Sequence, residues 1–263
     1  MSRIQVLDHG YIEKIEHWGS DERIIEAARM SVGDKGFLGW EPGPCPAHCP
    51  ASNDKAAEGT PCSACDGKGT IRGDKHLLKF LYDMRHATPF EMAGLVIETM
   101  IPIAAIREWH RHRTQSYNEM SARYIPLPDV NYVPSVDRCL MVNAQNKQAG
   151  AVKGSAELTH ESALEWLVEL AESYEHAERV YQSGLKRGIP KEVARLPVPV
   201  GRYTRMRASA NLRNWLAFLT LRSDHVVSGK AAQWEIRQYA NEVSNIIKAT
   251  FPRTHTLFVG DAT

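Results

Sequence analysis

The residues best suited to chemistry lie in one short stretch, EWHRHRTQSYNEMSARY, which runs from Glu108 to Tyr124. It combines three arginines and two histidines with two glutamates and several serine and asparagine side chains. Guanidinium groups are planar donors that hold phosphate and carboxylate groups through charge-assisted hydrogen bonds. A solvated charged face would also explain such a run, but a local cluster of donors suits a small anionic ligand better.

The composition limits the classes of protein to which the chain can belong. It has 263 residues, of which 43% are hydrophobic, so it is long enough to bury a core. A net charge of +1 disfavours non-specific nucleic-acid binding, which usually needs a broad basic excess. The sequence has no bilayer-spanning apolar run and no signal-peptide core near its start, so we expect a cytoplasmic protein without a membrane partner. Its five cysteines are then expected to be reduced, metal-bound or catalytic.

Hydrophobic periodicity predicts the elements that must position the donor-rich stretch. Alternation of apolar and polar residues predicts a strand or hairpin around Gly10 and a strand over residues 92–101. Apolar residues at helical spacing predict helices within residues 20–31, 74–91, 102–113, 160–188, 211–223 and 231–251. Ser20 is suited to cap the first of these helices, and Gly188 to end the fourth.

The segments between these elements are expected to be short or irregular. Residues 114–120 have no apolar period and should form a loop or short turn, whereas 121–128 should form a short strand. Residues 128–154 should form a surface loop, and 189–209 a helical turn followed by an extended segment. Strands and helices do not alternate regularly, so we expect an α+β fold with a central, mostly antiparallel sheet flanked by helices. Residues 1–263 should form a single domain that carries a Cys-rich insertion at 36–73.

The pattern Arg111-His112-Arg113-x-x-Ser116-x-Asn118-Glu119-x-Ser121-x-Arg123-Tyr124 resembles, at every fixed position, the signature of the flavin-dependent thymidylate synthases. The blocks HATPFE, EVARLPVPVGRYTR and NLRNWLAFLTLR…AAQWEIRQYA resemble further blocks of that family in the same order. The resemblance covers nearly the whole chain except residues 36–73 and the loop near 130–155. It implies methylation of dUMP to dTMP with methylenetetrahydrofolate as carbon donor and NADPH as the reductant of a bound FAD. It also implies a homotetramer with each active site built from several subunits.

The resemblance gives Arg222 the catalytic role. Its guanidinium would stabilise negative charge on the uracil and so direct electron density towards C5, which is a weak nucleophile. Arg111, Arg123 and Arg195 would hold the phosphate and the base edge. The residues that the resemblance places against dUMP are Glu108, Trp109, His110, Arg111, Glu119, Met120, Ser121, Ala122, Arg123, Arg195 and Arg222. Taken alone, Arg222 could equally be a helix-terminal arginine favoured by the helix dipole.

The same resemblance assigns a set of residues to the flavin. The FAD-contacting positions are Thr88, Arg111, His112, Arg113, Glu119, Asn211, Leu212, Arg213 and Ala217. No Gly-x-Gly-x-x-Gly follows a predicted strand, so a Rossmann-type cofactor site is not supported and the side chains must come from separate segments. His86 and Glu192 match family positions near the nucleotide and flavin, although a capping histidine and a Glu192–Arg195 salt bridge would explain them as well.

Two residues depart from the family pattern. Glu108 stands where the family often has a glutamine that touches the nucleotide, and an ionised carboxylate can accept but not donate a hydrogen bond. Ala217 stands where many members have a polar residue against the adenine part of FAD. The Ala217 departure predicts weaker FAD binding. Substitutions such as Glu108 leave room for a related flavoenzyme that acts on UMP, or that forms a hydroxymethyl product.

The cysteines are placed for metal binding rather than for uracil chemistry. None lies within residues 108–124, so the donor-rich stretch offers no cysteine thiolate that could add to the pyrimidine. Cys45-x3-Cys49 and Cys62-x2-Cys65 predict a tetrahedral structural zinc site, with His48 as a spare ligand. The run CSACDGKG resembles the knuckle of the DnaJ zinc region. Disulfides, or a loop with free thiols, are the alternatives, and a zinc-knuckle module that binds nucleic acid is a function of another class.

Overall fold

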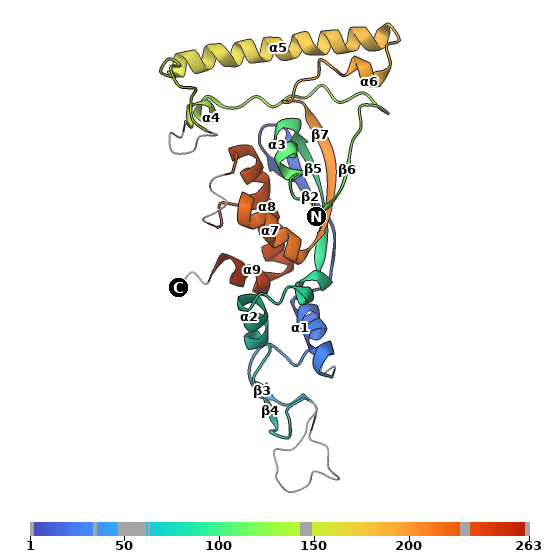
Figure 1. Cartoon of the computed structure of the whole chain (residues 1–263), viewed down its shortest axis with the longest axis vertical. Coiled ribbons are helices and arrows are strands. Elements are labelled where there is room, and N and C mark those ends of the chain that lie inside the picture. The colour runs from blue at the N-terminus through green and yellow to red at the C-terminus, as the bar shows by residue number, and fades with distance from the viewer. Residues whose placement is uncertain are drawn as a thin grey trace. The chain divides into compact units, whose positions relative to one another are not determined.

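The computed structural model describes residues 3–33, 36–46, 62, 64–142, 149–226 and 232–260. The chain forms two compact units, and Figure 1 labels the elements of both. Unit 1 contains Met1–Ile15, Val96–Ser209 and Phe218–Val243. Unit 2 contains Glu16–Leu95, Ala210–Ala217 and Ser244–Thr263.

A five-stranded sheet runs in the order β1-β2-β5-β7-β6. Its strands are β1 (Ile4–Val6), β2 (Gly10–Trp18), β5 (Gly94–Pro102), β7 (Tyr203–Asn211) and β6 (Ser116–Glu119). Strands β1 and β2 pair antiparallel with Val6 opposite Gly10, which confirms the predicted hairpin. A Cβ at Gly10 would lie 2.0 Å from the hydroxyl of Tyr239 and 2.7 Å from the carbonyl of Met100, so only glycine fits there.

The two segments next to the donor-rich arginines differ from their predicted structures. Residues expected to form a loop contain β6, which pairs antiparallel with β7 and sets Ser116 opposite Ser209. The expected strand after it is instead a turn, in which the carbonyl of Ser121 accepts from the backbone N–H groups of Tyr124 and Ile125. The sequence Ser-Tyr-Asn-Glu has little strand propensity, so the pairing with β7 decides its conformation.

The sheet has an apolar face and a polar face. Along β7, Met206 and Ala208 are buried whereas Arg205 and Arg207 between them are exposed. The apolar face is covered in unit 1 by helices, and its centre holds Trp109, Phe218 and Tyr239, all fully buried. The rings of Trp109 and Phe218 stack with their centroids 4.7 Å apart. The antiparallel sheet flanked by helices confirms the predicted α+β fold class.

The helices of this face come from separate parts of the chain. They are α3 (Ile103–Trp109), α7 (Leu212–Arg222) and α8 (Trp234–Thr250). Helix α3 ends four residues before the predicted Arg113, because the hydroxyl of Tyr117 donates to the backbone carbonyl oxygens of Trp109 and His112 and closes a turn there. The helix was predicted to begin at Pro102, but Pro102 ends β5 and is the N-cap, so the first helical residue is Ile103.

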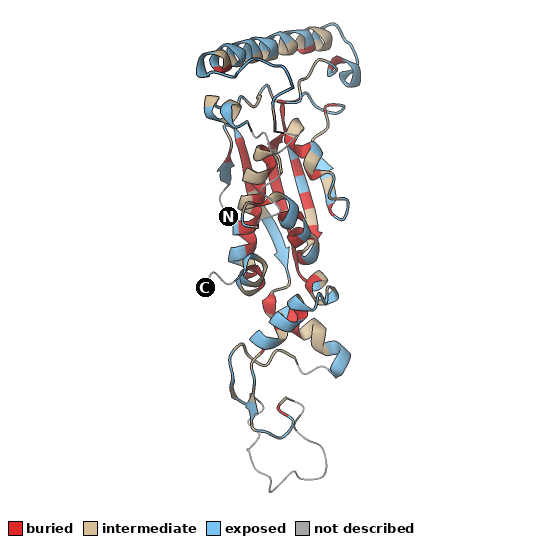
Figure 2. Ribbon diagram, turned by 60° about the vertical axis from the view of Figure 1, so that its left-hand side comes forward, coloured by how far each residue is buried: buried red, intermediate tan, exposed pale blue. Residues whose placement is uncertain are grey.

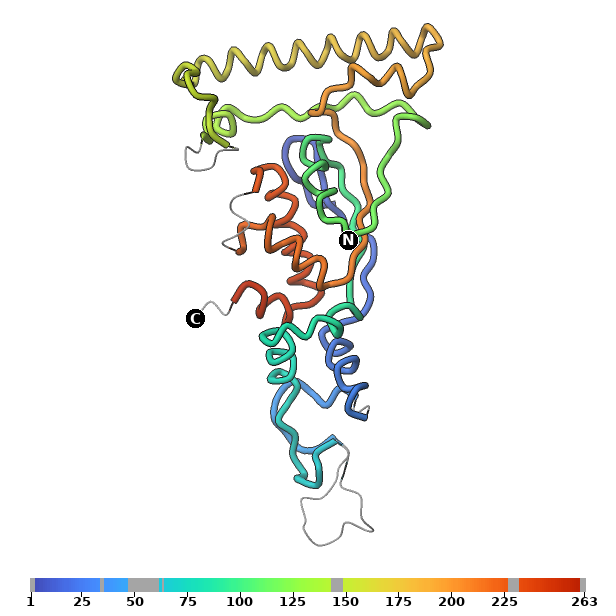
Figure 3. Tube along the Cα trace, in the orientation of Figure 1, coloured from blue at the N-terminus to red at the C-terminus, as the bar shows by residue number. Residues whose placement is uncertain are grey.

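Helix α5 (His160–Lys186) is the long helix that the sequence predicts most clearly. Thr159 and Ser162 form a capping box at its start. The hydroxyl of Tyr174 donates to the carbonyl of Tyr132, and Glu178 pairs at 2.6 Å with the fully buried Arg202, which directly precedes β7. Figure 3 traces the chain from α5 into β7. Most of the helix is exposed, including apolar residues on it (Figure 2).

The shorter helices of unit 1 are α4 (Val136–Leu140) and α6 (Lys191–Ala194). The first lies in the predicted surface loop and so corrects that interpretation. It is capped by Ser135, whose hydroxyl accepts from the N–H of Arg138, and it contains Cys139, which the sequence placed in a loop. The predicted helical turn before β7 is confirmed as α6.

Unit 2 contains small helices and a two-stranded sheet. Its elements are α1 (Asp21–Arg29), η1 (Met30–Val32), β3 (Gly43–Pro44), β4 (Thr70–Ile71), α2 (Lys75–Asp83), η2 (Thr88–Met92) and α9 (Pro252–Val259). Ser20 caps α1 as predicted. The sequence did not predict α9, whose first turn is held by the buried Asp21 through the N–H groups of Arg253 and Thr254. None of the described helices is long and apolar enough to cross a bilayer.

Candidate active site

Arg222 lies at the centre of a side-chain cluster in unit 1. Its Nη1 donates to Oε2 of Glu108 at 2.9 Å, and its Nε donates to Nε2 of His112 at 3.1 Å. The side chain of Arg222 is 18% exposed, so the guanidinium is largely enclosed but still reachable. Among the described residues these two bonds use only part of the donor set of the guanidinium, and its other N–H groups are suited to donate to a ligand. The helix-terminal arginine is therefore held by side chains as well as favoured by the dipole.

His112 is held in its neutral form. Burial lowers the pKa of His112 to about 4, and the nearby charge of Arg222 acts in the same direction. Its ring lies edge-on to Phe218 with the centroids 4.9 Å apart. Because the neutral imidazole presents Nε2 as an acceptor to Arg222, the proton of the neutral ring is on Nδ1.

We expect this histidine to make stability depend on pH. The folded state keeps His112 neutral down to about pH 4, whereas the unfolded chain takes up the proton near pH 6.5. Protonation therefore favours unfolding, and the free energy of unfolding should fall as the pH drops through that window. Urea unfolding at about pH 7 and about pH 5 should show a larger loss for the parent than for His112→Gln. Equal losses in the two proteins would remove His112 from the pH dependence.

Tyr117 fixes the turn that carries His112. Its hydroxyl donates to the backbone carbonyl oxygens of Trp109 at 3.1 Å and His112 at 2.8 Å. Burial raises the pKa of Tyr117 to about 12, so it remains a donor at neutral pH. The indole of Trp109 donates to Oε1 of Gln115 at 3.0 Å. The turn is thus closed by side chains of its own sequence, and Trp109 supports it from a fully buried position.

A second cluster of predicted site residues lines a pocket of about 240 Å³ in unit 1. The lining residues that the sequence predicted are Glu119, Met120, Ala122 and Arg195. Arg195 is exposed and directly follows α6, whereas Ala122 is buried. The rest of the lining is mostly apolar and includes Ile103, Leu127 and Val198. A pocket with an apolar wall and one guanidinium suits a flat ring that carries an anionic group.

The predicted phosphate ligand Arg123 is tied to the helix before Arg195. Its Nε donates to Oε2 of Glu192 at 3.1 Å, and Lys191 donates to the carbonyl of Tyr124 at 2.7 Å. From the sequence alone, a Glu192–Arg195 salt bridge was an alternative explanation for Glu192. The structure pairs Glu192 with Arg123 instead. Both members of the Arg123–Glu192 pair are more than half exposed, so the pair adds little to stability and an anion could displace the carboxylate.

The remaining arginines of the stretch are exposed. Arg111 and Arg113 both have exposed side chains, and their backbone N–H groups continue the turn after α3. Ser121 accepts from the N–H of Arg123 through its hydroxyl at 3.3 Å, so it shapes the next turn. Among the described residues, Arg222 bonds to Glu108 and His112, whereas Arg195 lines its pocket with Glu119, Met120 and Ala122.

Sequence reasoning missed a charged group on the polar face of the sheet. Glu98 of β5 accepts from the hydroxyl of Tyr11 at 2.8 Å, from Arg205 at 3.0 Å and from Arg207 at 2.9 Å. Burial would raise the pKa of Glu98, but the hydrogen bonds from Tyr11 and the arginines outweigh it and lower the pKa. The group lines a hollow of about 370 Å³ together with Asn118, Glu119 and Met120 of the signature. The alternating arginines Arg205 and Arg207 of β7 were the sequence signal that could have identified this charged group.

Unit 2 places several predicted flavin residues at the start of α7. The side chain of Asn211 accepts from the N–H of Asn214 at 2.9 Å and so caps the helix. Arg213 pairs with Glu91 of η2, the element that also contains the exposed Thr88. Leu212 is fully buried, and Ala217 is exposed on the same helix. A helix N-terminus with an adjacent guanidinium favours an anionic group such as a pyrophosphate.

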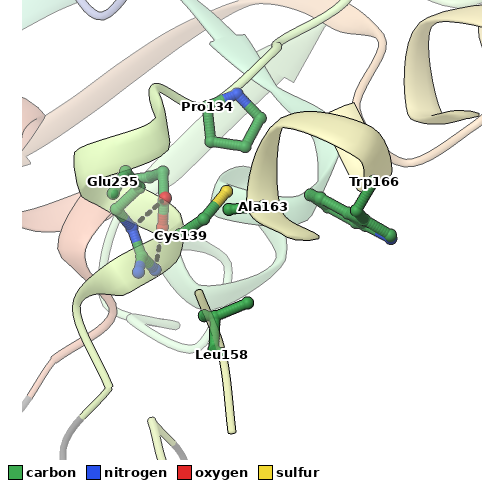
Figure 4. Close-up of a pocket in the computed structure, with 7 residues that line it drawn as sticks. Pro134, Cys139, Leu158, Ala163, Trp166 and Glu235 are labelled. Carbon is green, nitrogen blue, oxygen red and sulfur yellow. Dashed lines mark hydrogen bonds and ion pairs between the residues drawn. The ribbon is translucent and has the colours of Figure 1, made fainter. Parts of the chain in front are cut away.

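Three of the four predicted metal ligands lie together in unit 2. Cys45, Cys62 and Cys65 place their sulfur atoms within 4.8 Å of one another. Cys49 and the spare ligand His48 lie outside the described residues. The cysteine of unit 1 is separate from this group, in the hollow that Figure 4 shows, where Arg138 donates to Glu235 at 2.7 Å beside Cys139. Burial raises the pKa of the Cys139 thiol, which argues against a nucleophilic thiolate there.

Comparison with known proteins identifies the family. A family described as thymidylate synthase complementing protein matches residues 14–253. A flavin-dependent thymidylate synthase of Thermosipho africanus (strain TCF52B) is 32% identical over 255 residues, which is 97% of this chain and 93% of that protein. The chain belongs to the flavin-dependent thymidylate synthase family.

Other members of the flavin-dependent thymidylate synthase family agree with this assignment. An enzyme of Thermus thermophilus is 32% identical over 257 residues, covering 97% of this chain and 77% of that protein. Among solved structures, the UMP/dUMP methylase PolB of Streptomyces cacaoi bound with 5-Br UMP matches with a TM-score of 0.72 and 26% identity. The match covers 97% of this chain and 96% of PolB.

Membership of the flavin-dependent thymidylate synthase family makes the chain an enzyme of the methyltransferase class. The side-chain clusters described above are therefore candidate parts of a methyltransferase active site. The structure groups Glu108 and His112 with Arg222, and Glu119, Met120 and Ala122 with Arg195. His86 is exposed in unit 2 and lies edge-on to Phe80, with ring centroids 5.4 Å apart.

Proposed function

We propose that this protein methylates C5 of dUMP to form dTMP, with a bound flavin and methylenetetrahydrofolate as the carbon donor. The observation that carries the proposal is the position of Arg222, a largely enclosed guanidinium held by Glu108 and the neutral His112. The names of the relatives and of the PolB structure support a pyrimidine nucleotide as the substrate. The complete signature around Arg111–Tyr124 supports the same conclusion.

The residues of this chain can activate uracil without a protein nucleophile. A guanidinium beside the ring stabilises negative charge that develops on the oxygen and N3 side, and so favours electron density at C5. His112 accepts from Arg222 and holds it in one orientation, while Glu108 balances its charge. The described cysteine of unit 1 has a raised pKa, so a thiolate that adds to C6 is not provided there.

The substrate would be bound through its phosphate. Arg195 at the pocket, with Arg123 and Arg111 on the exposed stretch, supplies guanidinium groups for a dianion. The apolar wall formed by Ile103 and Leu127 would cover the sugar and base. A phosphate can take the place of Glu192 beside Arg123, since that ion pair is exposed.

The flavin would be FAD, with NADPH as its reductant. A bound FAD supplies the electrons that convert the transferred one-carbon unit to a methyl group. The residues present fit a phosphate-bearing cofactor, because the N-terminus of α7 presents the exposed Arg213 to an anion. This chemistry requires no metal ion, so any zinc bound by the protein would be structural.

We further propose a homotetramer in which each active site takes residues from more than one subunit. The exposed arginines Arg111, Arg123 and Arg195 could contribute to a site that another copy completes. Helix α5 exposes Trp166 and Val168, and Leu164 of its predicted stripe is 45% exposed, which suits an interface. The polar sheet face with Glu98 offers another surface for association.

UMP is the second candidate substrate. PolB is named as a methylase of both UMP and dUMP, and Glu108 departs from the family glutamine next to the nucleotide. Since Glu108 pairs with Arg222 in this structure, its contact to the nucleotide can differ from that of a glutamine. A hydroxymethyl product is a third candidate outcome for the transferred carbon.

One assay separates these candidates. The purified protein should show the visible spectrum of an oxidised flavin, and should convert dUMP when methylenetetrahydrofolate and NADPH are supplied. Mass spectrometry of the product should show a gain of one CH₂ group, whereas a hydroxymethyl product would be heavier by a further oxygen. Parallel reactions with UMP measure the preference. A colourless protein that converts neither nucleotide, but shifts RNA in a gel, would replace the enzyme proposal with the zinc-knuckle module.

A further inference from the structure

Three cysteine sulfur atoms converge in the part of unit 2 between α1 and α2. Cys45 and Cys65 are 3% and 5% exposed, and Cys62 is partly buried beside them. All three sulfur atoms lie within 4.8 Å of one another. Buried thiols that gather in this way either form disulfides or hold a metal ion.

The spacing of the sulfur atoms matches metal coordination and not a disulfide. Sγ of Cys45 and Sγ of Cys62 lie 3.8 Å apart. A disulfide would bring them to about 2.05 Å. Sulfur atoms that each lie about 2.3 Å from one zinc ion at tetrahedral angles are about 3.8 Å apart, the edge of that tetrahedron.

The backbone after Cys62 is folded for sulfur ligation. The N–H of Asp66 donates to the carbonyl of Cys62 at 2.8 Å, and the N–H of Lys68 donates to the carbonyl of Cys65 at 3.0 Å. The N–H of Gly69 donates to Sγ of Cys65 at 3.3 Å, a hydrogen bond that stabilises a thiolate. Asp66, Gly67 and Gly69 have φ values of 53°, 79° and 71°, which explains the glycines of this turn.

The hairpin places Cys45 against this turn. Strands β3 and β4 pair antiparallel with Pro44 opposite Thr70, and the N–H of Cys45 donates to the carbonyl of Gly69 at 2.8 Å. Cys45 is thereby held next to the residue whose N–H contacts Cys65. Cys45 directly follows β3, whereas Cys62 and Cys65 precede β4, so an ion would link the segments next to the two strands.

The described residues of this insertion offer little else to hold them. Strands β3 and β4 have two residues each, and an isolated hairpin of that length is marginal in water. The base of the insertion is fixed separately, by the buried Asp74, which accepts from Leu38 N–H and pairs with Arg29. The cysteines therefore lie where a cross-link would contribute most to local order.

We propose that Cys45, Cys62 and Cys65 bind a Zn²⁺ ion as thiolates and that this ion is structural. A structural zinc site takes four ligands, and the three described thiolates would supply three of them.

Metal analysis of the purified full-length protein tests the assignment without reference to turnover. We expect about one zinc per chain, with X-ray absorption showing sulfur neighbours at about 2.3 Å. At least three of these neighbours should be sulfur, one from each of Cys45, Cys62 and Cys65. Purified protein that contains no zinc, and takes up none after thiol reduction, would overturn the proposal. A Cys62–Cys65 disulfide in the untreated protein, or bound iron in place of zinc, would also overturn it.

Variants give an independent comparison. Cys62→Ser should lower the zinc content roughly tenfold or more, because it removes one thiolate from a closed site. Cys139→Ser is the matched control, since this cysteine belongs to α4 in unit 1, and it should keep the parental zinc content. If Cys62→Ser does not fold, the X-ray absorption spectrum of the parent protein still tests whether sulfur atoms bind zinc. The same zinc content in both variants would contradict the assignment, whether or not the protein methylates dUMP.

Discussion

Replacing Arg222 by alanine is expected to lower kcat for dUMP methylation by about 10- to 100-fold, because a charge-assisted hydrogen bond contributes about 1.5–3 kcal/mol. KM for dUMP should change much less, since the guanidinium acts mainly on charge that develops during the reaction. The flavin spectrum of the variant should match that of the parent. Steady-state kinetics together with the visible spectrum measure both parts of the prediction.

Arg138→Ala is a matched control for the loss of a partly buried, ion-paired arginine. Arg138 is 25% exposed and pairs with Glu235 on another element, as Arg222 is 18% exposed and pairs with Glu108. The control variant should lose stability but keep kcat. Normal turnover by Arg222→Ala would exclude Arg222 from the mechanism. An equal fall of kcat in both variants would show that the loss of Arg222 lowers kcat only through a general loss of structure.

Replacing Arg195 by alanine should act on binding rather than on the chemical step. We expect KM for dUMP to rise by about tenfold with kcat nearly unchanged, because the exposed guanidinium would hold the phosphate in both the ground state and the transition state. The difference in KM from the parent should shrink as salt is added, since exposed charges are screened. Initial rates over a range of dUMP and salt concentrations give the result.

The control for Arg195 is an exposed arginine outside the described clusters. Arg179 on α5 is 67% exposed and pairs with Glu175 of the same helix at 3.8 Å. Arg179→Ala should leave KM for dUMP and its salt dependence unchanged. An unaltered KM in Arg195→Ala, or a fall in kcat as large as that of Arg222→Ala, would contradict the phosphate-binding role.

Elements with strong local signals could be predicted from the sequence. Helix α5 has a clear apolar period and a capping threonine, and α1 has Ser20 in the capping position. The hairpin around Gly10 follows from the alternation of apolar and polar residues in β1 and β2. In each case a pattern of neighbouring residues was enough to predict the element.

Elements decided by distant partners were mispredicted. β6 is a strand because β7 pairs with it, and its own residues give no period. α9 depends on Asp21, more than two hundred residues earlier in the sequence, which caps it through backbone N–H groups. Local patterns cannot show such partners.

The candidate site likewise contains residues that the sequence could identify and contacts that it could not. The arginines and histidines of the signature could be found from their types and spacing, and three of the predicted cysteine ligands do lie together. The sequence could not show that Glu108 pairs with Arg222 or that the pKa of His112 is lowered. Both result from the packing of α3 and the turn after it against α7. Glu98 was missed for the same reason, as its arginine partners lie on a different strand.

A crystal structure of the protein with FAD and dUMP bound would test the central claim most directly. We predict that the nucleotide phosphate contacts the guanidinium of Arg195, that the uracil lies against Arg222, and that the isoalloxazine ring stacks on the base. Residues from two subunits should complete each site. A nucleotide bound away from both arginines, with the flavin elsewhere, would contradict the account.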